Sequence, residues 1–149
     1  MTILKLNPEQ MSTHTSPFSH IVCHEKSSLA FLSGQTAVDR DGTLVGEGDA
    51  ARQTEQVFKN IEAALESLGE SWASVISLTT YLTSYEHMQA FRETRARLFD
   101  SYFPDGGHPA HTLLVVAGLG SPQHLIEVEA VVAHSLTGSS GVNVAEEPG

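Results

Sequence analysis

Apolar and polar residues alternate over short distances in the first third of the chain, which is typical of β-strands. Thr2 to Leu6 predicts an edge strand. The segment "SHIVCHEKSSLAFLSGQTAV" predicts two strands, Ile21 to His24 and Leu29 to Ser33, joined by a polar turn at Glu25 to Ser28. Asp41-Gly42 is a tight-turn signal that ends this region.

The spacing of apolar residues changes to a helical period after Asp49. Gly69 closes this first helix, and Ser84 can cap a second one over Glu86 to Tyr102. The apolar positions that define the first helix are Ala50, Val57, Ile61, Ala64, Leu65 and Leu68. The stripe of the second helix is Met88, Phe91, Arg95, Leu98, Phe99 and Tyr102.

Three further strands are predicted. "SVISLTTYLT" lies between the helices and alternates, with Ile76, Leu78 and Leu82 on its apolar side. Thr112 to Ala117 and Leu125 to His134 follow the second helix. His111 then stands at the start of a strand, within "GGHPAHTLLVVAGL", where it is either a turn residue or part of a site.

The order strands, helix, strand, helix, strands predicts an α+β fold, in which two helices cover one face of a sheet. The helix-facing side of the last strand is Ile126, Val128, Ala130 and Val132. Its other side mixes Glu127 and Glu129 with apolar residues, and the strand at Leu29 to Ser33 is apolar on both sides. An uncovered apolar face predicts contact with another subunit.

Length and composition fit one globular domain. We expect an N-terminal segment at residues 1–15 with an edge strand, a single domain at 16–134 and a disordered tail at 135–149, where nothing can be buried.

The net charge of -10, with only eight Lys and Arg, argues against nucleic-acid binding. Arg92, Arg95 and Arg97 fit a solvated helix face. No apolar run approaches the about 18 residues that span a membrane, and no signal peptide is visible. The single cysteine, Cys23, cannot form an internal disulfide and fits a small buried side chain. A cytoplasmic location is therefore expected.

The motifs "SGQTAVDRDGTLV", "QTEQVFKNIEAALESLG", "VISLTTYLT", "HPAHTLLVV" and "IEVEAVVA" resemble, in order and spacing, the YjgF/Rid family of reactive-intermediate deaminases. The resemblance covers about Ser16 to Ala133. It implies a chorismate-mutase-like fold and a homotrimer with a central barrel and small-molecule pockets between subunits. It also implies hydrolysis of imines and enamines to a keto compound and ammonia, without a metal or cofactor.

The resemblance assigns roles residue by residue. The family's carboxylate-clamping arginine is replaced by His111, and imidazole cannot form a planar two-point clamp. Glu127 matches the family glutamate that positions water or passes a proton. Phe18 matches an aromatic residue without its hydroxyl, Ser33 matches the serine of "SGQ", and Arg92 takes the place of a helix asparagine.

Three other patterns in the sequence resemble functional sites. A metal site at His108 and His111 lacks further ligands, and His108 fits a loop residue. Glu127 and Glu129 share a strand face, which fits either an acid/base pair or a charged surface. The glycines of "GLG" at 118–120 precede no helix and no lysine, so a phosphate loop is not expected.

Three functions follow. The first is a Rid-type deaminase that uses Glu127 and His111 on a substrate whose carboxylate is absent or bound differently, with Phe18, Ser33 and Arg92 in the binding site. The second is a non-catalytic trimer that binds a small metabolite. The third is an endoribonuclease, which the acidic charge disfavours.

Overall fold

The computed structural model describes residues 3–13, 17–24 and 28–134. Most of the expected turn at 25–28, the boundary at residues 15 and 16, and the tail at 135–149 therefore lie outside the described residues. Among the described residues, no helix is long and apolar enough to cross a membrane.

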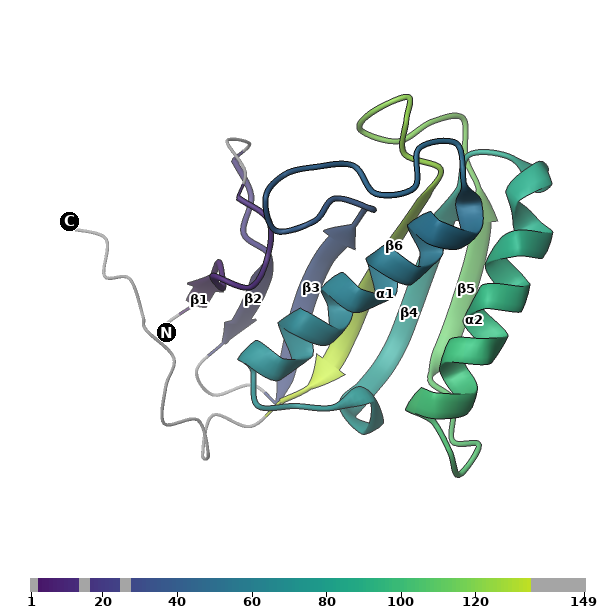
Figure 1. The fold of residues 1–149 in the computed structure, drawn as a ribbon. Helices are drawn as coiled ribbons and strands as arrows, with labels where there is room; N and C mark the ends of the chain where they lie inside the picture. The colour runs from purple at the N-terminus through teal and green to yellow at the C-terminus, as the bar shows by residue number, and fades with distance from the viewer. Residues whose placement is uncertain (1–2, 14–16, 25–27, 135–149) are drawn as a thin grey trace.

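One six-stranded sheet forms the centre of the structure, with strand order β1-β2-β3-β6-β4-β5 (Figure 1). The strands are β1 (Ile3–Leu6), β2 (Ile21–His24), β3 (Leu29–Gln35), β4 (Val75–Leu82), β5 (Ala110–Val115) and β6 (Ile126–Ala133). All neighbours are antiparallel except β4 and β5, which are parallel. The predicted N-terminal strand is present at one edge, and β5 forms the other edge.

Two helices, α1 (Ala50–Ser67) and α2 (Met88–Tyr102), lie on the same face of the sheet (Figure 1). Asp49 caps α1 by accepting a hydrogen bond from the Arg52 N–H, at 3.0 Å. Gly69 follows α1 with a φ of 71°, a conformation that favours glycine. The predicted α+β arrangement with both helices on one face is confirmed.

The core lies between the helices and the sheet. Its centre is Phe58 of α1, whose ring packs edge-on against Phe99 of α2 at 5.7 Å and near Trp72 at 5.9 Å. From the sheet, β6 contributes the side that the sequence assigned to the helices, and all four residues are buried: Ile126, Val128, Ala130 and Val132. This burial is the main source of the fold's stability.

No helix of residues 3–13, 17–24 and 28–134 lies on the opposite face of the sheet (Figure 1). Phe31 of β3 points to this helix-free face and is 53% exposed. Val22 and Val131 pair with Phe31 on the neighbouring strands and share its side of the sheet. The uncovered apolar face expected from the sequence is therefore present.

The sequence prediction placed Ile76 on the same side of β4 as Leu78 and Leu82, and this placement is wrong. The register between β4 and β6 shifts between Val75 and Ser77, so Ile76 is the extra residue of a β-bulge and is 45% exposed. Strict alternation, on which the prediction rested, does not hold across a bulge. The buried side of β4 is Val75, Leu78, Thr80 and Leu82.

The ends of two elements also differ from the prediction. Strand β5 begins at Ala110, so His111 lies inside the strand and not before it. The first turn of the second helix is a separate 3-10 turn at Tyr85–His87, where Ser84 accepts a hydrogen bond from the Glu86 N–H at 3.1 Å. Ser84 thus caps this tighter turn, and α2 itself starts at Met88.

Candidate functional site

A β-bulge in β3 brings the "SGQ" motif beside Glu127. Leu32 pairs with Ala130 and Gln35 with Val128, so Ser33 and Gly34 together oppose the single residue Glu129. A side chain at Gly34 would place its Cβ 2.0 Å from Glu127 Oε1. The Glu127 carboxyl group therefore lies directly on the Gly34 backbone, in space that only glycine leaves open.

Glu127 and Glu129 both lie on the helix-free face, but their environments differ. The Tyr81 hydroxyl donates to Glu129 Oε1 at 3.0 Å, whereas no described residue donates a hydrogen bond to the Glu127 carboxyl group. Partial burial, followed by the negative charge of Glu129, raises the pKa of Glu127 above its ordinary value. Glu127 is thus the carboxyl group of this pair that is free to act on a ligand.

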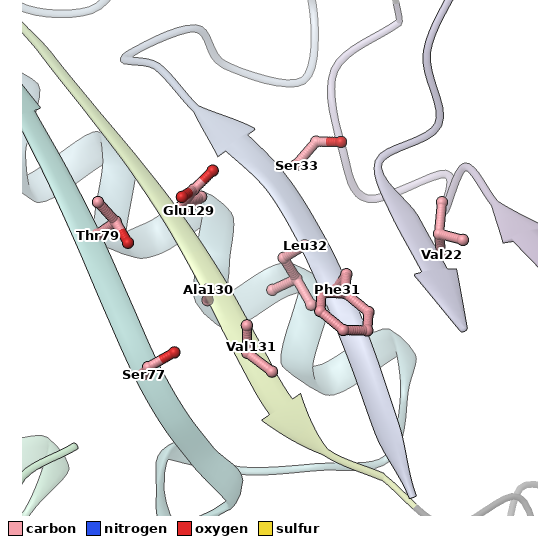
Figure 2. A pocket seen from close by; sticks show the side chains of 9 residues that line it. All are labelled: Val22, Phe31, Leu32, Ser33, Ser77, Thr79, Glu129, Ala130 and Val131. Carbon is pink, nitrogen blue, oxygen red and sulfur yellow. The ribbon is translucent and has the colours of Figure 1, made fainter. Parts of the chain in front are cut away.

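A hollow of about 350 Å³ lies on the helix-free face and is lined by Glu129 but not by Glu127. Figure 2 shows Phe31 and Ser33 from β3, Glu129 and Val131 from β6, and Ser77 and Thr79 from β4 around it. Its walls combine apolar surface with a few hydroxyl and carboxyl groups. This mixture is typical of sites for small organic molecules and also of surfaces between subunits.

Ser33, which lines the hollow, forms hydrogen bonds to the segment before β2. Its hydroxyl donates to the Ser19 carbonyl at 2.7 Å, and the Ser33 N–H donates to the His20 carbonyl at 2.9 Å. Phe18, which immediately precedes this segment, is 43% exposed and meets the His20 ring edge-on at 5.3 Å. The structure therefore connects Phe18, Ser33 and Glu127 through neighbouring backbone segments.

His111 lies on the other face of the sheet from Glu127. It pairs with Leu78, whose side chain is buried under the helices, whereas Glu127 pairs with Tyr81 on the helix-free side. In a single protomer the two predicted catalytic residues therefore do not meet.

Both ring nitrogens of His111 have partners. Nε2 lies 2.8 Å from the hydroxyl oxygen of the fully buried Thr80, and Nδ1 lies 3.4 Å from Nη1 of Arg95. A guanidinium group only donates, so Nδ1 is the acceptor, and the proton of a neutral ring is then on Nε2. Burial, and then the charge of Arg95, lower the pKa of His111 to about 4, which keeps the imidazole neutral at pH 7.

The sequence grouping of Arg95 with Arg92 and Arg97 predicted a solvated helix face. This prediction is wrong for Arg95, which is half-buried. Its guanidinium carbon lies 5.4 Å from the centroid of the Phe91 ring and 5.8 Å from that of Phe99. Arg92 is exposed, and its charge acts on the site only by helping to lower the pKa of Arg95, after the larger effect of burial. Arg97 is exposed and pairs with Glu55.

His108 is an exposed residue of the loop before β5, against the rings of Phe99 and Phe103. Among residues 3–13, 17–24 and 28–134, no three His, Cys, Asp or Glu side chains gather as metal ligands. Cys23 is buried, and burial raises the pKa of its thiol.

Two contributors were missed in the sequence. Buried Gln53 of α1 donates to the Gly46 and Gln123 carbonyls and accepts from the Leu125 N–H at 2.9 Å, which fixes the start of β6 just before Glu127. The only signal for it is a polar residue at a helix position that turns out to be fully buried. Arg95 had a clearer signal, because it is a cation within an otherwise apolar stripe.

The fold and the site define a small α+β protein with polar groups on an open sheet face and at an edge strand. The chain belongs to the family described as endoribonuclease L-PSP, the YjgF/RutC/Rid family, whose model matches residues 9–134. It is 31% identical over 115 residues to a RutC family protein of Pyrococcus horikoshii, which covers 77% of this chain and 85% of the relative.

Solved structures agree with this assignment. A yeast protein, YEO7, superposes with a TM-score of 0.77 at 30% identity and covers 89% of this chain and 99% of its own. A Rid family protein of Yersinia pestis shares the fold with a TM-score of 0.75 at 24% identity, covering 89% of this chain and 99% of its own. The family resemblance found in the sequence motifs is confirmed.

Proposed function

We propose that this protein hydrolyses reactive imines or enamines, releasing ammonia, in pockets between the subunits of a homotrimer. The observation that carries the proposal is Glu127, a half-buried carboxyl group on the Gly34 backbone to which no described residue donates a hydrogen bond. A carboxylate with a raised pKa and free lone pairs is suited to general acid and base catalysis on a small molecule.

The reaction consumes one water molecule, and both of its protons end on the nitrogen. Glu127 takes the first proton from water as the water oxygen bonds to the imine carbon, and the electron pair of the C=N π bond moves to nitrogen, to which Glu127 then passes that proton. Glu127 next takes the proton of the new hydroxyl group as the C=O bond forms and the C–N bond breaks. Nitrogen leaves with the electron pair of the C–N bond and receives this second proton from Glu127, so that imine plus water gives ketone plus ammonia.

Assembly is proposed because a protomer alone gives an incomplete pocket. His111 and Glu127 lie on opposite faces of the sheet, and His111 lies in the edge strand β5. The apolar helix-free face is open to a second copy. A neighbouring copy that covers this face can bring its own β5 edge toward Glu127, with Phe18 and Ser33 in the pocket wall.

The test uses imino acids generated in situ by an amino-acid oxidase, with ammonia and keto acid as the products measured. We expect Glu127→Gln to lower kcat by about 100-fold or more, as loss of a general base does. Glu129→Gln is the matched control on the same strand face and should retain turnover. Equal turnover by wild type and Glu127→Gln would overturn the proposal.

His111→Arg tests whether the substrate is a simple imino acid. Activity in the wild type means that the present residues bind the substrate carboxylate. Activity only in the variant means that the natural imine is bound differently. Saturable binding of the imino acids without product in either protein would favour the non-catalytic trimer.

The family description, endoribonuclease, also suggests RNA cleavage as an alternative activity. The net charge of -10 opposes binding of a polyanion. RNA cleavage that disappears in Glu127→Gln would favour this activity over deamination.

A further inference from the structure

The hollow on the helix-free face has one polar end and one apolar end. At the polar end, Glu129 of β6 pairs with Thr79 of β4, and the bulge of β3 places Ser33 on its other side. At the apolar end, Val131 lies beside Phe31. Figure 2 shows these two rows of side chains one after the other along the strands. The hollow therefore suits a molecule with a polar head and a hydrocarbon body.

Glu129 is a partly buried carboxylate that no described residue matches with a positive charge. The Tyr81 hydroxyl donates to its Oε1 at 3.0 Å, and Oε2 has no hydrogen-bond partner among residues 3–13, 17–24 and 28–134. A charge that is partly withdrawn from water costs free energy unless an opposite charge lies beside it. A cation from outside the chain would supply that charge.

The hydroxyl groups around Glu129 can accept hydrogen bonds from such a cation. Thr79 and Ser77 of β4 line the hollow, and their hydroxyl groups have no partner in the described part of the chain. Ser33 donates its proton to the Ser19 carbonyl at 2.7 Å, so its oxygen can still accept. An ammonium group carries three donors and no acceptor, which matches one carboxylate oxygen with hydroxyl acceptors on either side.

The apolar end provides a surface for a hydrocarbon chain. Phe31 is 53% exposed, and Val22 and Val131 pair with it on the neighbouring strands. Residues two apart on a strand lie roughly 6.6 Å apart. A chain of about four carbon atoms spans this rise, so a butyl group whose ammonium lies at Glu129 reaches Val131 and Phe31.

We propose that this hollow binds a small primary organic ammonium ion, with its ammonium group on Glu129 and its hydrocarbon body against Phe31. The inference goes beyond the proposed function, because Glu127 does not line the hollow and no step of imine hydrolysis needs a bound cation. Because Tyr81 already uses Oε1, the carboxylate offers one free oxygen, which suits the point charge of an ammonium group better than the planar fork of a guanidinium group. The net charge of -10 also favours a cationic ligand.

An NMR titration of the full chain with n-butylammonium at pH 7 tests this site. Amide signals of β3 and β6 beside the hollow should shift in a saturable way. Glu129→Gln, which keeps the shape of the side chain, should weaken the affinity about 10-fold or more, and Thr79→Val, which removes one acceptor, about 3-fold. The second variant keeps the test valid if the first fails to fold. 1-Butanol, which has the same body without the charge, should bind the wild type about 10-fold more weakly.

Glu127→Gln is the matched control, because it removes a carboxylate from the same strand and the same face that does not line the hollow. It should change the affinity for n-butylammonium by less than about 3-fold at physiological salt, which screens charges that do not touch the ligand. Equal losses in Glu127→Gln and Glu129→Gln would overturn the inference, because they would indicate a general attraction of cations to an acidic face.

Equal affinity of the wild type and a folded Glu129→Gln variant would also overturn the inference, as would 1-butanol binding as tightly as n-butylammonium. The absence of n-butylammonium binding to the wild type would overturn it as well, and a changed sedimentation equilibrium of Glu129→Gln would then indicate that a second copy fills the hollow. The imine assay decides the proposed function separately. Ammonium binding that depends on Glu129 without imine hydrolysis would leave this inference standing while the deaminase proposal fails, and hydrolysis without ammonium binding would do the reverse.

Discussion

His111 is a histidine whose environment removes its usual ability to carry charge near neutral pH. Its ring is enclosed by Phe91 and Phe99 and faces Arg95 and Thr80. In the free protomer the ring is therefore neutral and lies between Thr80 and Arg95 as a hydrogen-bonding partner of both. A role in proton transfer would require a ligand or a neighbouring subunit to change these partners.

This environment predicts a pH dependence of stability. The unfolded chain protonates His111 near the ordinary value of 6.5, whereas the folded chain does so only at about 4. Between these values the unfolded state binds the extra proton, so the contribution of His111 is complete above pH 6.5 and falls as the pH falls. We expect His111→Asn to reduce the loss of unfolding free energy between pH 7 and 4.5 by about 1–2 kcal/mol, after allowance for partial exposure. Denaturant unfolding measures it, with exposed His108→Asn as the control; equal losses in wild type and His111→Asn would contradict the assignment.

Glu127 predicts a separate pH dependence of activity. Its carboxylate must be ionised to take a proton from water, and its pKa is raised by burial and by Glu129. In the pH profile of kcat, the acid limb should therefore lie at a higher pH than it would for a glutamate with an ordinary pKa. Glu129→Gln should move that limb to lower pH, because it removes a negative charge that disfavours ionisation. An unchanged limb would show that another group limits the rate.

At the level of elements, the sequence indicated strands and helices well because their apolar periods are long and regular. It failed where one residue breaks the period, as at the bulge that exposes Ile76. The site was indicated in part. The roles of Glu127, Ser33 and Phe18 stay predictions, although their backbone segments are neighbours. The Gly34 bulge and the Arg95 contact depend on pairing between segments far apart in the chain. No local pattern encodes such pairing.

The bulge in β3 gives a direct prediction. Gly34→Ala would place a methyl group 2.0 Å from Glu127 Oε1, so the flexible carboxyl group must move away. We expect a loss of turnover close to that of Glu127→Gln, with a cost in unfolding free energy of only about 1–2 kcal/mol. Gly118→Ala, where no atom lies within 4 Å of the added carbon, is the control. Full activity in Gly34→Ala would mean that the position of Glu127 is not critical.

For the whole molecule, the helix-free face is the surface on which the proposed function depends. One face of the sheet is covered by α1 and α2, and the other presents Phe31 and the hollow beside Glu129 (Figures 1 and 2). The sequence predicted this asymmetry because two helices can cover only one face. The number and orientation of the copies in the proposed assembly are not encoded in the pattern of one chain.

Phe31→Glu should separate the proposed assembly while leaving the protomer folded, because Phe31 is 53% exposed and lies outside the buried core. Sedimentation equilibrium should show a trimer for the wild type and a smaller species for the variant, which should also lose turnover. Tyr85→Glu, at a residue that is 77% exposed on the turn before α2, should remain assembled. An assembled Phe31→Glu variant would place the interface elsewhere.

Because β5 lies at the sheet edge, added denaturant should abolish substrate binding before it opens the central strands. Within the part of the chain that the structure describes, this strand pairs only with β4, while β6 is paired on both sides. Edge elements with fewer partners open at lower free energy than the centre of a sheet. Local opening of β5 would carry His111 away from Thr80 and release Arg95. Substrate affinity should therefore decline at denaturant concentrations at which amide hydrogens of β6 are still protected from exchange.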